Sequence, residues 1–187
     1  VVLVAAFLLY IINNDWIMAP SVLVRRFLFV PAQLKFQYYD FFLNHPKVYF
    51  ADGLIGTLFS IESPYGMNVP NVIAFFYHGR IYGANTGYWG DAYANLGIAG
   101  VVIFSIVLAF IVKLIESITT NIPKAIVLPS LMFIFLNLND QALLTTLLTG
   151  GLWLLIVLLY LFDSYLYFQK EENSSAALAK KCKYIML

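Results

Sequence analysis

The sequence predicts an all-α, polytopic membrane protein, in which several spanning helices form a bundle beside a large extracytoplasmic loop. Composition is the first reason: of 187 residues, 61% are hydrophobic and only 11% are charged, whereas an average soluble domain is about half apolar and about a quarter charged. Long uncharged segments are the second. This composition excludes a disordered chain, a disulfide-stapled secreted domain and an ordinary cytosolic enzyme. The net charge of +1 gives nucleic-acid binding no electrostatic support.

The apolar segments define four regions of the chain. Because a spanning helix needs about 20 mostly apolar residues, we interpret residues 1–12 as the end of a truncated spanning helix, and the chain as the C-terminal part of a longer protein. Residues 13–95 are the extracytoplasmic loop region, which re-enters the membrane or lies at its interface. Residues 96–168 hold three predicted spans, and residues 169–187 form a cytoplasmic tail. The expected spans are 96–115, 122–138 with a kink at Pro129, and 143–162.

Basic residues next to the spans predict the orientation. Lys113 and Lys124 flank one short connection, and four lysines follow the last span. Short flanks rich in Lys and Arg face the cytoplasm. The loop region 13–95 therefore lies on the outer side.

The loop region is aromatic and balanced in charge, with five basic and five acidic residues. Tyr and Trp favour the membrane–water interface, so we expect this region to lie on the outer leaflet or to dip into it. One helix is predicted from Pro31, a first-turn residue, to His45, which precedes a second proline. Its polar residues share one face. That face indicates either an amphipathic anchor or the lining of a substrate cleft; it comprises Gln33, Gln37, Asp40 and Asn44.

Several catalytic motifs are absent from the sequence. It has no phosphate-binding G-x-x-x-x-G-K-[ST] loop, no H-E-x-x-H or Cys/His cluster, no Asp-x-Asp pair and no G-x-S-x-G elbow. We therefore predict neither a metal site nor a cofactor.

Three arginines of the loop region are candidate anion ligands. Arg25 and Arg26 lie among apolar residues, and Arg80 follows an aromatic stretch. A guanidinium at membrane depth is costly unless it is paired with an anion, and its planar fork suits a phosphate. A diphosphate lipid headgroup is one interpretation; snorkelling to ordinary headgroups is the other.

Glycine and amide residues cluster just before the first predicted span. Six of the 11 glycines lie between positions 79 and 100, interleaved with Asn85, Asn95 and aromatic rings. Glycine permits close backbone approach to a ligand, and amides with aromatic faces suit a carbohydrate. A plain packing loop is the alternative. Asp91 and His78 are candidate general bases for a sugar hydroxyl, although Asp91 also suits a helix cap and His78 a structural role.

These segments together resemble the oligosaccharide repeat-unit polymerases, which include the bacterial Wzy-type O-antigen and capsule polymerases. The resemblance covers roughly residues 22–115, about half of the chain. It is carried by Arg25–Pro31 (RRFLFVP), Gln37–Phe42 (QYYDFF), Gly83–Gly87 (GANTG) and Asp91–Gly100 (DAYANLGIAG).

The resemblance implies a metal-independent glycosyltransferase of the GT-C-like multi-span type in the bacterial inner membrane. It would polymerise undecaprenyl-diphosphate-linked oligosaccharides at the periplasmic face, in contact with membrane lipids and a chain-length regulator. Under this hypothesis the catalytic residues are Arg26, Arg80 and Asp91, and which arginine acts in catalysis is left open. The substrate-binding residues would be Arg25, Tyr38, Tyr39, His78, Asn85 and Asn95.

Three other functions are compatible with the sequence. One is a structural membrane subunit, which the clusters of arginine and glycine disfavour. An O-antigen ligase would use the same lipid-linked donor but a lipid A core as acceptor. A flippase or other transporter fragment would carry lipid or polysaccharide without making a bond. The predicted spans hold almost no ionisable residue at their centres and show no internal repeat, which disfavours the transporter.

Overall fold

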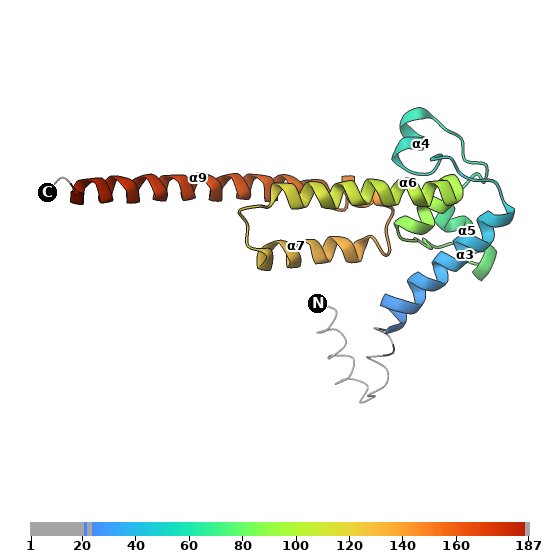
Figure 1. Ribbon diagram of the computed structural model, residues 1–187. Coiled ribbons are helices and arrows are strands. Elements are labelled where there is room, and N and C mark those ends of the chain that lie inside the picture. Colours follow the sequence, from blue (N-terminus) through green and yellow to red (C-terminus); the bar gives the residue numbers. More distant parts are fainter. Residues whose placement is uncertain (1–20, 22–23, 186–187) are drawn as a thin grey trace. The chain divides into compact units, whose positions relative to one another are not determined.

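The computed structural model describes residue 21 and residues 24–185, and this part of the chain is helical without a strand (Figure 1). The predicted truncated helix at 1–12 lies outside the described residues. Two compact units are present. Unit 1 comprises the described residues up to Phe104 together with Leu138–Leu143, and unit 2 comprises Ser105–Asn137 and the described residues from Leu144 onward.

The first helical stretch of unit 1 changes its winding at a proline. The π-helical η1 (Arg25–Phe29) runs directly into α3 (Val30–Asn44), and the Val30 N–H donates to the Arg25 carbonyl, five residues back. Pro31 has no N–H, and its ring crowds the carbonyl four residues earlier, so the α-helical pattern is interrupted there. The prediction of a helix from Pro31 to His45 is confirmed, because α3 ends where His45 takes an extended conformation.

Two further helices lie in unit 1: α4 (Leu54–Phe59) and α5 (Val69–His78). The second begins with Pro70 in its first turn and ends at Gly79, whose φ of 64° closes the helix through a bond to the Phe75 carbonyl. Helices α3 and α5 pack against each other. Their apolar faces form the core of unit 1, which includes Leu34, Tyr38, Phe41, Phe42, Val69, Ile73 and Ala74.

The long helix α6 (Tyr88–Ile118) is broken near its start. Gly97 has φ 66° and ψ −146°, a conformation outside the helical region, which glycine adopts at low cost. A side chain at Gly100 would overlap the Ala92 carbonyl oxygen from before the break. The helix thus begins eight residues earlier than the predicted span at 96, and regular α-helix resumes only after Gly97.

Unit 2 contains α7 (Lys124–Asn137), nearly all of α8 (Leu143–Leu148) and α9 (Leu152–Ile185). The Asp163 carboxylate of α9 accepts from the Asn121 backbone N–H at 2.6 Å and from its side-chain amide at 3.0 Å, which ties the turn before α7 to α9. The unit's core comprises Ile115, Ile122, Val127, Ile134, Leu152, Ile156 and Leu159.

The helices of unit 2 differ from the predicted spans in two places. The expected span at 143–162 is divided into α8 and α9 at Gly151, which has a φ of 87°. The expected tail at 169–187 continues α9 as helix to Ile185. Helix α7 has 14 residues with Pro129 inside and does not extend back to Ile122.

Two helices in the described part of the chain are long and apolar enough to cross a membrane, namely Tyr88–Ile118 and Leu152–Asn173. The shorter α7 is apolar but does not reach this length.

Candidate functional site

Helix α3 and the start of α6 border an open groove of about 510 Å³, which we call the α3 groove. Its lining is mainly aromatic, with one basic residue; it comprises Ala32, Lys35, Phe36 and Tyr39 of α3 and Trp89 of α6. The volume lies within the range typical of small-ligand pockets. Of the residues predicted to bind substrate, Tyr39 is the one that lines this groove.

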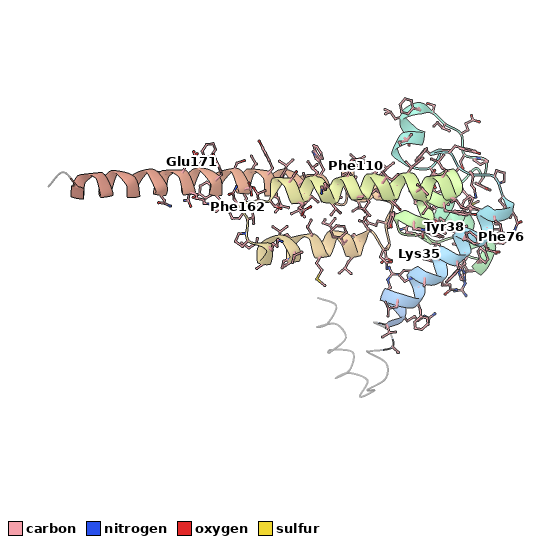
Figure 2. The ribbon with its side chains drawn as sticks, in the orientation of Figure 1. Lys35, Tyr38, Phe76, Phe110, Phe162 and Glu171 are labelled. Carbon is pink, nitrogen blue, oxygen red and sulfur yellow. The ribbon has the colours of Figure 1, made fainter. Side chains whose placement is uncertain are left out.

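Lys35 is held at the groove by a distant segment. Its ammonium donates a hydrogen bond to the side-chain carbonyl of Asn139, in the turn after α7. Burial lowers the pKa of Lys35, and the nearby Asp140 carboxylate partly opposes that shift. An anion bound in the groove would stabilise the charged form of Lys35, which burial destabilises. Lys35 and Tyr38 both project from α3 (Figure 2).

The turn after α7 that carries Asn139 also packs against the start of α6. The Tyr88 N–H donates to the Leu138 carbonyl at 3.1 Å. Gly87 lies so close to this turn that an added Cβ would be 2.5 Å from the Leu138 carbonyl oxygen, and closer still to that of Asn139. Because Gly87 has no side chain, the start of α6 can pack against the turn that carries Asn139, the acceptor of the Lys35 ammonium.

Aromatic rings continue from the groove into unit 1. Tyr93 stacks on Trp89 with centroids 6.0 Å apart and an interplanar angle of 7°, and lies 5.0 Å from the Tyr39 ring. Tyr93 also contacts Lys47, whose ammonium is 4.1 Å from the Tyr93 ring centroid, within the range of a cation–π contact. Burial lowers the pKa of Lys47. These contacts fix the orientation of Tyr93 and restrict Tyr39 and Trp89, two of the three rings that line the groove.

Tyr38, a predicted substrate-binding residue, holds the glycine-rich loop to α3. Its side chain is 2% exposed, and its hydroxyl donates to the Ala84 carbonyl at 3.0 Å. Burial raises the pKa of Tyr38, and the Asp91 and Asp52 carboxylates add to the shift. The phenol therefore stays a neutral donor. Asn85, the next residue of the loop, has an exposed side chain without a hydrogen bond to the described residues.

Asp91 and Asn95 form a small polar cluster in the first turns of α6. The Asn95 amide donates to the Asp91 backbone carbonyl at 2.9 Å and to its carboxylate at 3.3 Å. The Asn95 carbonyl accepts from the Phe50 N–H at 2.7 Å. Asp91 lies in the first turn of α6, where a carboxylate interacts favourably with the helix dipole. The structure brings these two predicted site residues together. The Asn95 side chain forms its hydrogen bonds with Asp91 and Phe50.

His78 is joined to α3 rather than to Asp91. Its Nε2 lies 3.1 Å from the Gln37 amide nitrogen and 3.4 Å from the Gln37 carbonyl oxygen. One turn further along α3, the Asp40 carboxylate accepts the hydroxyl of Tyr77. The polar stripe predicted on α3 therefore binds α5 at two points and holds the end of α5, from which Arg80 follows.

The Tyr77–Asp40 pair predicts a late tyrosine ionisation. Burial and the hydrogen bond to Asp40 raise the pKa of Tyr77 to about 12, against about 10 for a free tyrosine. The stability that this pair contributes is complete below pH 10 and is lost as the pH rises toward 12. Absorbance at 295 nm, as wild type minus Tyr77→Phe, should show one phenol ionising near pH 12, and Asp40→Asn should lower that value. Ionisation near pH 10 in the wild type would contradict the assignment.

The three arginines are exposed and have no hydrogen bond or ion pair with the described residues. Arg25 and Arg26 lie on η1, directly before the helix that carries the α3 groove, whereas Arg80 lies beyond the end of α5. The structure does not bring Arg80 into contact with the other two. Within the described part of the chain, no acceptor occupies their guanidinium groups.

Lys35, Trp89 and Asn139 are the site residues that sequence reasoning missed. Lys35 and Asn139 are 104 positions apart, so no local spacing connects them. The one signal in the sequence was the polar turn at Asn139 and Asp140, which lies between two apolar segments. Polar side chains in such a place indicate a contact with another part of the chain. Trp89 was one aromatic residue among many, and only folding places it opposite Tyr39.

No family model, no curated protein and no solved structure matches this chain.

Proposed function

We propose that this protein is a membrane glycosyltransferase that polymerises oligosaccharide repeat units carried on undecaprenyl diphosphate. The observation that carries the proposal is the α3 groove, an aromatic cleft with a single ammonium. Beside it lies a helical turn whose two guanidinium groups have no partner among the described residues. An amphiphile with an apolar chain and an anionic head is complementary to this arrangement of apolar and cationic groups.

The groove suits the hydrocarbon part of such a carrier. Phe36 is 75% exposed and Tyr39 is 41% exposed, so both present apolar surface that a chain can cover. Burial of hydrocarbon contributes about 0.8 kcal/mol per methylene. Lys35 would mark the end at which the chain meets its phosphates.

The arginines suit the diphosphate. Transfer begins when an acceptor hydroxyl oxygen attacks the anomeric carbon of the donor sugar. The bond from that carbon to the diphosphate oxygen breaks, and the diphosphate leaves on its carrier with both bonding electrons. Guanidinium groups at this place would stabilise the developing negative charge without a metal ion. Arg26 and Arg80 remain the candidate catalytic residues.

The proton of the acceptor hydroxyl requires a base, for which Asp91 and His78 are the candidates. Asp91 accepts a side-chain bond from Asn95, and His78 bonds Gln37. Either group has further acceptor capacity. Arg25, Tyr39 and Asn85 would contact substrate directly, whereas Tyr38 and Asn95 would act by holding the loops that surround it.

We place the protein in the bacterial inner membrane with its active face toward the periplasm. Two span-capable helices support a membrane location, and the lysines flanking the spans support this orientation. Membrane lipids and a chain-length regulator would be its partners.

Transfer by the purified full-length protein in vesicles tests the proposal. With undecaprenyl-diphosphate-linked repeats as sole substrate, we expect glycan ladders that remain on the carrier lipid, with equal yield in the presence of a metal chelator. Glycan joined to an added lipid A core would instead identify a ligase. Movement of lipid-linked sugar between leaflets without a new glycosidic bond would identify a transporter and would overturn the proposal.

A further inference from the structure

The connection between α3 and α5 carries a short apolar excursion whose tip is exposed outside the core of unit 1. Residues 53–61 (GLIGTLFSI) contain no ionisable side chain, and Asp52 and Glu62 bound them. At its tip, Leu58 is 72%, Phe59 69% and Ile61 38% exposed. Helix α4, within this stretch, stands apart from α3 and α5 (Figure 1). A single six-residue helix gains little stability in water.

The stem of this excursion, by contrast, is firmly held. Tyr49 and Phe50 have φ values of 52° and 64°, a left-handed conformation that is costly for residues other than glycine. Asn95 accepts the Phe50 N–H at 2.7 Å, and the Ala94 carbonyl accepts the Val48 N–H at 3.0 Å. Residues 48–50 are therefore fixed against Ala94 and Asn95 of α6, and the excursion leaves the core of unit 1 from this point.

That point adjoins the apolar part of a helix that is able to cross a membrane. The Phe50 ring stacks on Phe104, with centroids 6.1 Å apart and an interplanar angle of 12°. On the same stretch of α6 after Gly97, Ile98 is 73% and Val102 is 53% exposed. The stem of the excursion thus rests on the segment whose exposed side chains suit a lipid environment.

We propose that the tip formed by Leu58, Phe59 and Ile61 inserts into the outer leaflet of the bilayer and anchors the outer part of unit 1. The occupant of this surface is lipid acyl chain. Its uncharged apolar surface is bounded by charged residues at both ends, as in interfacial elements. Tyr49, 61% exposed at the stem, has the amphipathic ring typical of the headgroup level. The anchor is independent of the proposed glycosyl transfer.

Fluorescence quenching in vesicles tests the insertion. The full-length protein, with its cysteines including Cys182 replaced by serine, receives either Phe59→Cys or Asn68→Cys and an environment-sensitive NBD label. Asn68 is exposed and lies outside the apolar stretch, so it serves as the matched control. In phosphatidylcholine vesicles, we expect the label at 59 to be quenched by nitroxide on the lipid chains and protected from aqueous iodide. The label at 68 should show the opposite behaviour.

Two results would overturn the anchor. Equal access of iodide to both labels would place the tip in water, and protection from both quenchers would indicate a protein partner or a second copy. A label at Leu58→Cys repeats the measurement if the first variant folds poorly, which circular dichroism will show. Because no step requires transfer activity, failure here would leave the proposed function standing, and an inactive protein would leave the anchor standing.

Discussion

Replacing Arg26 by alanine in the full-length protein should abolish long glycan while membrane insertion remains normal. Arg26 is exposed on η1 and has no bond to the described residues, so its loss removes no contact that stabilises the described fold. If its guanidinium neutralises the leaving diphosphate, transfer should slow by about 100-fold or more, as when one donor is lost from a site that stabilises developing charge. Ladder length on gels and the initial rate of transfer measure the effect, and Arg80→Ala should behave alike.

Two further variants separate charge from geometry. Arg26→Lys keeps the charge and loses the planar fork, and should retain part of the activity. Lys113→Ala, which removes an exposed cation from α6 in unit 2, should leave the ladder unchanged. Normal ladders from both Arg26→Ala and Arg80→Ala would defeat the diphosphate role of the arginines.

Adding one methyl group at Gly87 should destabilise unit 1 and reduce activity together. The new Cβ would lie 2.5 Å from the Leu138 carbonyl oxygen, and neither backbone segment can retreat without breaking the bond between Tyr88 and Leu138. Overpacking of this kind costs about 1–3 kcal/mol and at times more. The displaced turn carries Asn139, the acceptor of the Lys35 ammonium, so binding at the α3 groove should weaken as well.

Gly83→Ala provides the matched control in the same loop. Its Cβ would be 3.7 Å from the nearest atom, in the Asn85 side chain, so the change in stability should stay within about 0.5 kcal/mol. Unfolding in mixed detergent micelles, followed by near-UV circular dichroism, measures both variants. Equal stability of the two variants would show that the turn after α7 does not close on Gly87.

Much of the helical architecture follows from local sequence. Pro31 and Pro46 bracket α3, and Gly79 ends α5, because proline and glycine act on their own backbone. The apolar stretches of α6 and α9 are evident from composition alone. The breaks at Gly97 and Gly151 were not predicted, since an isolated glycine in an apolar run is compatible with either a continuous helix or a kink. The glycine and amide cluster identified Asn95 and Gly87 as notable without revealing their contacts.

By itself, the sequence determined an all-helical chain with segments able to cross a membrane and with arginines in the region outside them. Tertiary structure alone decided that Lys35 meets Asn139, that Tyr39 and Trp89 line one groove, and that Asn95 holds the left-handed turn at Phe50. The physical reason is the range of the forces involved. Helix formation depends on residues within a turn or two of each other, whereas these contacts join residues 45 to 104 positions apart and arise only when packing brings distant segments together.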